Sequence, residues 1–290
     1  MQIVYHLGAH GTDKDRLLRA LLQNRDEIWK HGTEIPAPNR YRGVIGEAMN
    51  ALNGGSASAE MQEVLLDSIL DGEGAKRLVL SQPGFLGMPF RAISAQGLYA
   101  NAGERVMALS NLFPDSQIEF FMALKHPASL LMSVLEASGR PYAELMAGIE
   151  PDTLRWAPAI RRIVQAAQGR RIVLWCNEDT PLIWPEILHR IANVPRNPPL
   201  RGTMQVLAEL LPPEKLRQLQ DRIAAETDLA TDDRRAMVEQ ALAADAIADK
   251  VEIEADLPGW TQDMIDQMSE DYDRDIAQIV GLPGVEFIAP

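Results

Sequence analysis

Cysteine is almost absent from this chain of 290 residues, because Cys176 is the only one, and no disulfide can form within it. Such scarcity suits a reducing compartment. No apolar run approaches the roughly 20 residues that a membrane-spanning helix needs, and the first residues do not combine a basic stretch with a long apolar one, as a signal peptide would. We therefore expect a cytoplasmic protein in which Cys176 is a buried, unreactive thiol.

Basic residues are also in short supply, since 28 Lys and Arg stand against 41 Asp and Glu and give a formal net charge of -13. Nucleic acids and anionic membrane surfaces are polyanions that such a chain repels, so we expect neither as a partner. A small anion or a nucleotide is compatible with this charge, because the local field at one site can oppose the net charge. The sequence leaves the oligomeric state open.

Four short segments are nearly continuous in apolar residues, which is typical of parallel strands buried on both faces. Helical periodicity separates them, and this alternation predicts a parallel sheet with right-handed crossovers. We therefore expect an α/β fold in three layers, with a sheet of about four to five strands that includes 285–288 as a candidate last strand. The predicted strands cover 2–7, 77–81, 117–124 and 171–175, and the helices between them cover 12–31, 60–71, 103–112, 128–137 and 151–168.

From residue 180 onward the pattern becomes mostly helical. Proline-rich breaks divide the segment from about 195 to 258 into several helices, which we interpret as an elaboration of the α/β core. A C-terminal helix is expected at about 261–280, and its apolar residues recur on one face, so it should pack back on the core. The whole chain, 1–290, is thus interpreted as a single α/β domain.

The first predicted strand runs through a loop with two glycines, 8–12, into a helix. This is the layout of a phosphate-binding loop, in which backbone N–H groups and the positive end of the helix dipole face an anion. The loop is therefore a candidate anion site.

The stretch from His6 to Asp13 resembles the opening of the sulfotransferase family in its compact bacterial form. In that family, a loop of the His-Lys-Thr-Gly-Thr-Ser/Thr type binds the 5′-phosphosulfate of the donor, 3′-phosphoadenosine-5′-phosphosulfate (PAPS). The similarity covers the strand, Gly8, His10, Thr12 and the helix that follows.

Several positions of this loop depart from the family pattern. Gly11 stands where the family has its lysine, while Asp13, Lys14 and Asp15 stand where it has glycine and hydroxyl residues. Loss of the lysine removes a charge-assisted hydrogen bond worth about 1.5–3 kcal/mol. The two carboxylates suit the helix dipole but repel an incoming phosphate, whereas Lys14 can swing back toward the anion.

A second motif follows the predicted strand 117–124. The family's 3′-phosphate motif is Arg-x-Pro with a serine eight residues after the arginine, and here Lys125, Pro127 and Ser133 take those three positions. A cation at the end of a strand and a hydroxyl in the next helix can bracket a phosphate. Lysine keeps the charge of arginine but loses its bidentate geometry.

The resemblance implies a P-loop NTPase-like topology and a site for PAPS, or for its product 3′-phosphoadenosine 5′-phosphate (PAP), at the carboxyl ends of the strands. The late Arg-Lys-Gly loop of the family is reduced here to Arg201-Gly202. The donor-binding residues that the resemblance implies in this chain are Gly8, His10, Gly11, Thr12, Lys14, Lys125, Ser133 and Arg201.

Catalysis in that family needs a general base after the second strand to take the proton of the acceptor hydroxyl. Here Gln82 follows that strand, and an amide cannot act as a base. His10 and His126 are the nearest candidates for a catalytic base, because both leave the carboxyl ends of strands. We expect no metal, because strand alternation separates His6 from the loop that carries His10.

The leading hypothesis is a sulfotransferase-like protein whose ancestral activity is sulfuryl transfer from PAPS to a hydroxyl or amine, with turnover weak or lost. One alternative is an active sulfotransferase in which Lys14 replaces the missing lysine. Another is a non-catalytic module that binds a nucleotide or carbohydrate. A kinase is disfavoured, because the chain has no Gly-Lys-Ser/Thr loop. The sequence does not identify the acceptor.

Overall fold

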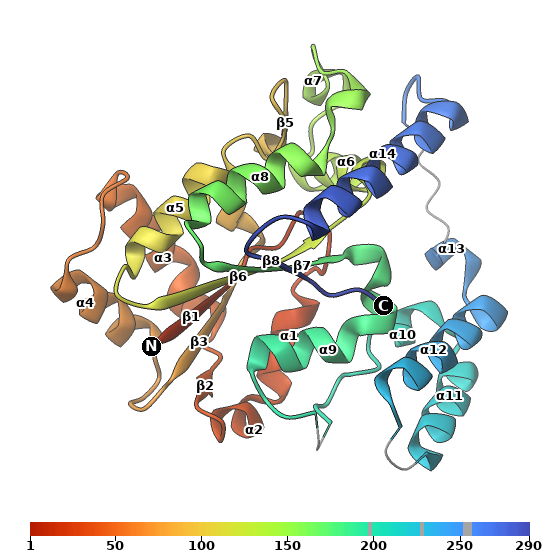
Figure 1. The fold of residues 1–290 in the computed structure, drawn as a ribbon, viewed down its shortest axis with the longest axis horizontal. Coiled ribbons are helices and arrows are strands. Elements are labelled where there is room, and N and C mark those ends of the chain that lie inside the picture. Colours follow the sequence, from red (N-terminus) through yellow and green to blue (C-terminus); the bar gives the residue numbers. More distant parts are fainter. Residues whose placement is uncertain (197–198, 227–228, 252–256) are drawn as a thin grey trace.

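The computed structural model describes residues 1–196, 199–226, 229–251 and 257–290. Its centre is a parallel sheet of six strands in the order β2-β3-β1-β6-β7-β8 (Figure 1). The α/β class and the parallel sheet are therefore confirmed. The strands are β1 (Gln2–His6), β2 (Thr33–Glu34), β3 (Arg77–Ser81), β6 (Gln117–Leu124), β7 (Arg171–Cys176) and β8 (Val285–Phe287), and a separate antiparallel hairpin joins β4 (Ile93–Ser94) to β5 (Gly97–Leu98).

Helices follow most of the strands. The helices that accompany the sheet are α1 (Arg16–Gln23), α2 (Arg25–Trp29), α3 (Pro38–Leu52), α4 (Ala59–Ile69), α5 (Ala102–Leu112), α6 (Pro127–Ser138), α7 (Tyr142–Leu145), α8 (Trp156–Ala167), α9 (Thr180–Ala192) and α14 (Gln262–Val280). The helical elaboration consists of α10 (Leu207–Leu210), α11 (Pro213–Ala225), α12 (Thr231–Asp245) and α13 (Ala248–Val251). Parts of the predicted segment 195–258, namely 197–198, 227–228 and 252–256, lie outside the described residues.

The two faces of the sheet bury different side chains, because successive residues of a strand point to opposite sides. Along β1, Ile3 and Tyr5 join a core with residues of α3, α5, α8 and α14. Val4 joins a second core with residues of α1 and α9 on the other face. The sheet is thus the middle layer of three, as expected from its uniformly apolar strands.

Two local expectations were wrong, and one helix was not predicted. The helix predicted at 12–31 is two helices, because the Asn24 side chain donates to the Ala20 carbonyl at 2.7 Å and ends α1. The sheet gains a sixth strand in β2, whose two residues are too few to form an apolar run. Helix α3 was not predicted, and its interior glycines, Gly43 and Gly46, weaken the helical signal in the sequence.

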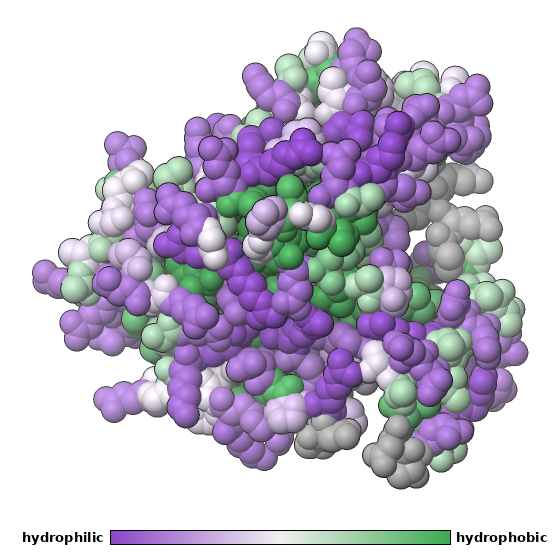
Figure 2. All heavy atoms as spheres, viewed as in Figure 1, coloured by the Kyte–Doolittle hydropathy of each residue, from purple (hydrophilic) through white to green (hydrophobic). Residues whose placement is uncertain are grey.

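The helical elaboration packs against α9 and surrounds a small core of its own, and Figure 1 shows it beside the sheet rather than over it. Helix α14 returns to the main core and buries Met268, Tyr272 and Ile279 there. Charged side chains protect the edge strand β8, where Glu286 forms ion pairs with Arg171 and Arg190. On the face shown in Figure 2, hydrophilic side chains dominate, and an apolar patch lies between α8 and β8.

Across the described residues, none of the helices is both long and apolar enough to cross a membrane.

Candidate functional site

The candidate site lies where β1 and β6 end. These strands are parallel neighbours, with His6 opposite Phe121, and the Leu7 N–H donates to the Phe121 carbonyl at 2.9 Å. The loop after β1 and the segment that starts at Lys125 therefore leave the sheet side by side. Residues that are more than a hundred positions apart in the sequence meet at this edge.

Lys125 turns back toward the loop after β1. Its Nζ donates to the Gly11 carbonyl at 3.1 Å and to Ser133 Oγ at 2.8 Å, and the residue is only 9% exposed. Trp156 Nε1 donates to the Lys125 carbonyl at 2.7 Å and fixes the backbone there. Three residues of the predicted site, Gly11, Lys125 and Ser133, are thus in contact.

The loop carries a second cation, Lys14. Burial lowers the pKa of Lys125, the positive charge of Lys14 adds to the lowering, and the carboxylates of Glu178 and Glu136 oppose it. Lys14 has a φ of +49°, a left-handed conformation that a lysine rarely adopts. Within the described chain, no carboxylate oxygen forms a salt bridge with either ammonium group. The Lys125 ammonium is therefore left without an ion pair among the described residues, although the charges of Glu178 and Glu136 act on it.

Gly11 lets the loop pack directly on α6. Its φ is +74°, and a Cβ placed there would lie 2.3 Å from Ser133 Oγ. Gly8, at φ +59°, similarly approaches Pro83. Thr12 closes the loop on itself, because its Oγ1 donates to the Ala9 carbonyl at 2.7 Å. These contacts make Gly8 and Thr12 part of the internal structure of the loop.

Asp13 occupies the N-terminus of α1. Its Oδ1 accepts the Asp15 N–H and its Oδ2 accepts the Leu17 N–H, both at 3.1 Å. In a phosphate-binding loop, an anionic ligand accepts N–H groups of this kind. Asp15 in turn pairs with Arg42 at 2.6 Å. The chain therefore supplies its own anion where the resemblance places the 5′-phosphosulfate.

His10 belongs to a stack of three rings. Its ring lies parallel to that of Tyr99, with centroids 5.8 Å apart, and Tyr99 stacks on Trp156 at 5.6 Å. Tyr99 Oη accepts the His10 backbone N–H and donates to His10 Nδ1, both at 2.9 Å. Tyr99 is buried at a φ of +45°, so the fold holds a strained residue at this point. The Nδ1 atom of His10 is consequently already engaged.

Protonation of His10 is expected to reduce stability in acid. Burial lowers the pKa of His10 below its ordinary value of 6.5, with a hydrogen bond to the Gly87 backbone opposing the shift. Below pH 6.5 the unfolded state binds the proton first, so stability declines until pH reaches the folded-state pKa. Urea unfolding at about pH 7.5 and about pH 5.5 should show a larger loss for the wild type than for His10→Gln. The exposed control His31→Gln should behave as the wild type, and an unchanged pH dependence in His10→Gln would refute this assignment.

His126 faces α14 instead of the loop. Its backbone N–H donates to Glu178 Oε1 at 2.8 Å, and its Nε2 lies 3.1 Å from Ser269 Oγ. Tyr272 packs edge-on against the imidazole and donates to Glu178 Oε2 at 3.1 Å. Burial lowers the pKa of His126, and Glu178 opposes this. The two predicted catalytic histidines thus have different partners: His10 contacts Tyr99, and His126 contacts residues of α14.

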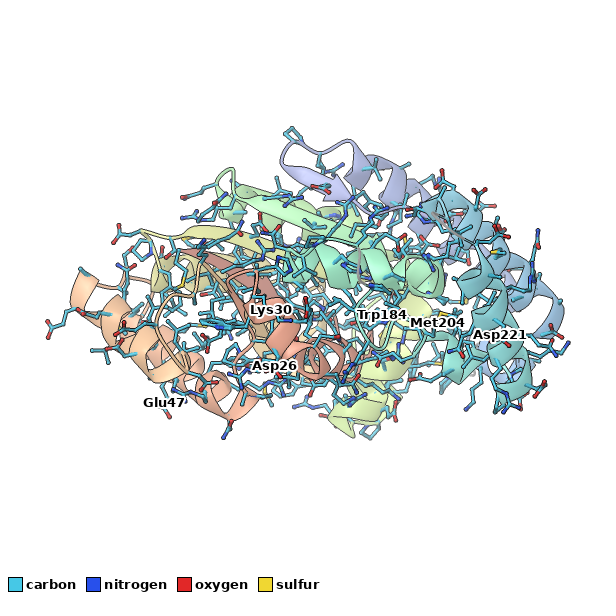
Figure 3. The ribbon with its side chains drawn as sticks, turned by 90° about the horizontal axis from the view of Figure 1, so that it is seen from below. Asp26, Lys30, Glu47, Trp184, Met204 and Asp221 are labelled. Atoms are coloured by element: carbon cyan, nitrogen blue, oxygen red, sulfur yellow. The ribbon has the colours of Figure 1, made fainter. Side chains whose placement is uncertain are left out.

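The Arg201 backbone lies away from the loop after β1. Its backbone N–H donates to Asn24 Oδ1 at 2.7 Å, and its carbonyl accepts the Asn24 side chain at 2.9 Å. Asn24 follows the C-terminal end of α1, whereas the loop precedes its N-terminal end, and eight helical residues span about 12 Å. The structure therefore does not bring the Arg201 backbone to the loop. Trp184, labelled in Figure 3, holds this segment through a 3.0 Å bond from Nε1 to the Gly202 carbonyl.

Two further observations concern metal and thiol chemistry. In the described ranges, no group of three or more His, Cys, Asp or Glu is placed to hold a metal ion. His6 Nδ1 lies 2.8 Å from Ser81 Oγ, and its ring stacks on Trp175 inside the second core. Burial raises the pKa of the Cys176 thiol to about 12, so the thiolate is scarce at neutral pH.

Sequence reasoning missed three residues that shape this site: Tyr99, Trp156 and Arg42. Arg42 and Trp156 lie in or beside helices without a recognisable motif, and their partners are distant in sequence. The left-handed conformation of Tyr99 has no sequence signal, because the residue is not glycine or asparagine. Comparison with protein-family models and with curated proteins finds no match to this chain.

Proposed function

We propose that this chain is a sulfotransferase-like protein that binds a 3′-phosphorylated nucleotide through Lys125, Ser133 and Lys14, and that it has lost sulfuryl transfer. The observation that carries the proposal is the 2.8 Å contact of Lys125 Nζ with Ser133 Oγ beside Gly11. These are the positions that the family resemblance assigns to 3′-phosphate binding.

The order of the strands supports a P-loop NTPase-like topology. The chain leaves β1 toward β3 and β2 on one side of the sheet, and β6 and β7 follow on the other. Where the strand order changes direction in this way, the loops that follow neighbouring strands diverge and leave a crevice at the carboxyl ends of the strands. Ligands bind in this crevice in open parallel sheets. The loop after β1 and Lys125 both lie at this point.

Electrostatics supports an anionic ligand. Burial and the positive charge of Lys14 disfavour the charged form of Lys125, so an anion bound beside its ammonium group would stabilise that form. Lys125 uses two of its three donor hydrogens on Gly11 and Ser133, so one is left for a phosphate oxygen. The residues present fit a 3′-phosphate in this respect.

The site does not fit a transferable sulfuryl group. Asp13 takes the N–H groups of α1 that would hold the 5′-phosphosulfate and adds negative charge beside them. Gln82 follows β3, where the family has its base, and His10 Nδ1 is held by Tyr99. Asp13 thus takes donors that would stabilise the leaving group, and neither Gln82 nor His10 Nδ1 offers a free proton acceptor, which argues against transfer.

Titration with PAP tests this proposal. Saturating PAP should raise the melting temperature, with a gain of about 2.7 kcal/mol in unfolding free energy when its concentration is a hundred times Kd. AMP, which lacks the 3′-phosphate, should produce a much smaller shift. Lys125→Ala should abolish the PAP shift relative to its own baseline, and the surface variant Lys215→Ala should retain it. Absence of a shift at millimolar PAP, or an equal shift in Lys125→Ala, would contradict the proposal.

An active sulfotransferase that uses Lys14 is the second candidate, favoured by the place of Lys14 in the loop after β1, from which its charge acts on Lys125. The two candidates differ in a PAPS turnover assay with hydroxyl and amine acceptors. Our proposal predicts no conversion of PAPS to PAP above the uncatalysed rate. Turnover that is lost in Lys14→Ala, with PAP binding retained, would establish the second candidate.

A further inference from the structure

A cavity of about 280 Å³ lies at the opposite edge of the sheet, between α2, β2 and the segment after α4. Thr33 opens β2 and pairs with Arg77, the first residue of β3, so this is the edge where the parallel strands begin. Figure 3 shows Asp26 and Lys30 of α2 well away from the helical elaboration that carries Asp221. Lys125 follows the carboxyl end of β6, whereas this cavity lies where β2 and β3 begin, so the two sites are separate.

Glu34 lines this cavity and is 3% exposed. Its Oε1 accepts the Asp71 N–H at 2.6 Å, whereas its Oε2 is buried and has no hydrogen-bond partner in the described structure. Burial raises the pKa of Glu34, and Arg25 opposes this from 3.9 Å, beyond hydrogen-bond length. A buried carboxylate oxygen without a donor is unfavourable, and a donor supplied by a ligand would remove that penalty.

Trp29 lines the same cavity and is 41% exposed, which is high for so large an apolar side chain. The electron-rich face of an indole attracts organic cations. Asp26 and Asp71 add two carboxylates to the lining, and Asp71 forms ion pairs with Arg25 and Arg40. The cavity thus combines an aromatic wall, the carboxylate of Asp26 and one unsatisfied acceptor on Glu34.

We propose that this cavity binds a primary alkylammonium group, which donates to Glu34 Oε2 while its alkyl chain lies against Trp29. An ammonium fits better than a guanidinium, because a bidentate guanidinium needs both carboxylate oxygens and Oε1 is already occupied by Asp71. The cavity volume suits a short alkyl chain. Arg25 is the chain's own cation beside Glu34, so it competes with the ligand.

The test follows the indole N–H signals of the five tryptophans by NMR during titration with n-butylammonium. Trp29→Phe identifies the Trp29 signal. We expect that signal to shift with a millimolar Kd, and n-butanol, of nearly the same shape but uncharged, to leave it unchanged. Glu34→Gln should weaken binding at least tenfold, since it keeps the acceptor for Asp71 and removes the charge. Glu27→Gln, the same change on helix α2 near Trp29 but outside the cavity, should have no effect.

Arg25→Gln should have the opposite effect on n-butylammonium affinity. Removing the competing cation should tighten n-butylammonium binding several-fold, whereas a merely structural role of Arg25 would not improve affinity. Comparison of 1,4-diaminobutane with a capped Gly-Lys-Gly peptide then shows whether the ammonium belongs to a free amine or to a lysine side chain. An equal response to n-butanol, or unchanged affinity in both Glu34→Gln and Arg25→Gln, would overturn the proposal.

Discussion

Gly11→Ala is expected to destabilise the protein by about 2–5 kcal/mol, from left-handed backbone strain of about 1–2 kcal/mol and overpacking of about 1–3 kcal/mol. The φ of +74° disfavours any side chain, and the new Cβ would lie 2.3 Å from Ser133 Oγ and 2.4 Å from Ser133 Cβ. The Ser133 side chain is held by Lys125 and by the Ser129 carbonyl, so it cannot move aside freely. Urea unfolding at neutral pH measures the change.

The matched control is Gly46→Ala, in the interior of α3 where a Cβ meets nothing within 4 Å. This variant should be more stable than the wild type by about 0.5–1 kcal/mol, because alanine loses less conformational entropy in a helix. Adding Gly11→Ala to Ser133→Gly should cost only the backbone part, measured against Ser133→Gly alone, because glycine inside α6 itself costs about 0.5–1 kcal/mol. If Gly11→Ala unfolds at the wild-type urea concentration, the loop does not pack on α6 as described.

Asp275→Ala is expected to cost about 3–5 kcal/mol, the usual loss when one member of a buried ion pair is removed. Asp275 is 2% exposed and accepts four hydrogen bonds. Two come from the Arg155 guanidinium, at 2.6 and 3.1 Å. The others come from the N–H groups of Trp156 and Ala157, at 2.7 and 3.1 Å, so one carboxylate caps the start of α8. Removing it leaves the first turn of α8 without these acceptors.

The effect of Asp275 should extend to the candidate site, because α8 begins with Trp156, which holds the Lys125 carbonyl and stacks on Tyr99. We therefore expect Asp275→Ala to weaken PAP binding as well as stability. Asp273→Ala, an exposed carboxylate on the same helix, is the matched control and should change unfolding free energy by at most about 0.5 kcal/mol. Equal urea midpoints for the two variants would refute the capping role of Asp275.

The four longest strands, β1, β3, β6 and β7, could be predicted because each is a short apolar run that leaves little choice of conformation. The predicted 117–124 and 77–81 coincide with β6 and β3, and 2–7 and 171–175 differ from β1 and β7 by one residue at one end. The element boundaries that failed depend on tertiary contacts. Asn24 ends α1 partly because its side chain also binds the Arg201 carbonyl, 177 positions away.

The candidate site also has features that could be predicted from the sequence and features that depend on tertiary contacts. The resemblance to the 3′-phosphate motif implies that Lys125 and Ser133, eight residues apart, flank one site, and the two side chains are in contact. The acidic start of α1 indicates a helix end that supplies its own negative charge, and Asp13 caps it through N–H groups two and four positions away. These features are local, so the sequence alone carries them.

The sequence by itself determined the alternation of buried strands and helices, the loop after β1 and the cation and hydroxyl that follow β6, because hydrophobic periodicity and short-range spacing act within a few residues. Only the tertiary structure decided which groups surround them. Tyr99 reaches His10 across 89 positions, and Asp275 reaches Trp156 across 119. The physical reason is that such partners are selected by the packing of whole layers, and their hydrogen bonds satisfy polar groups that this packing removes from water.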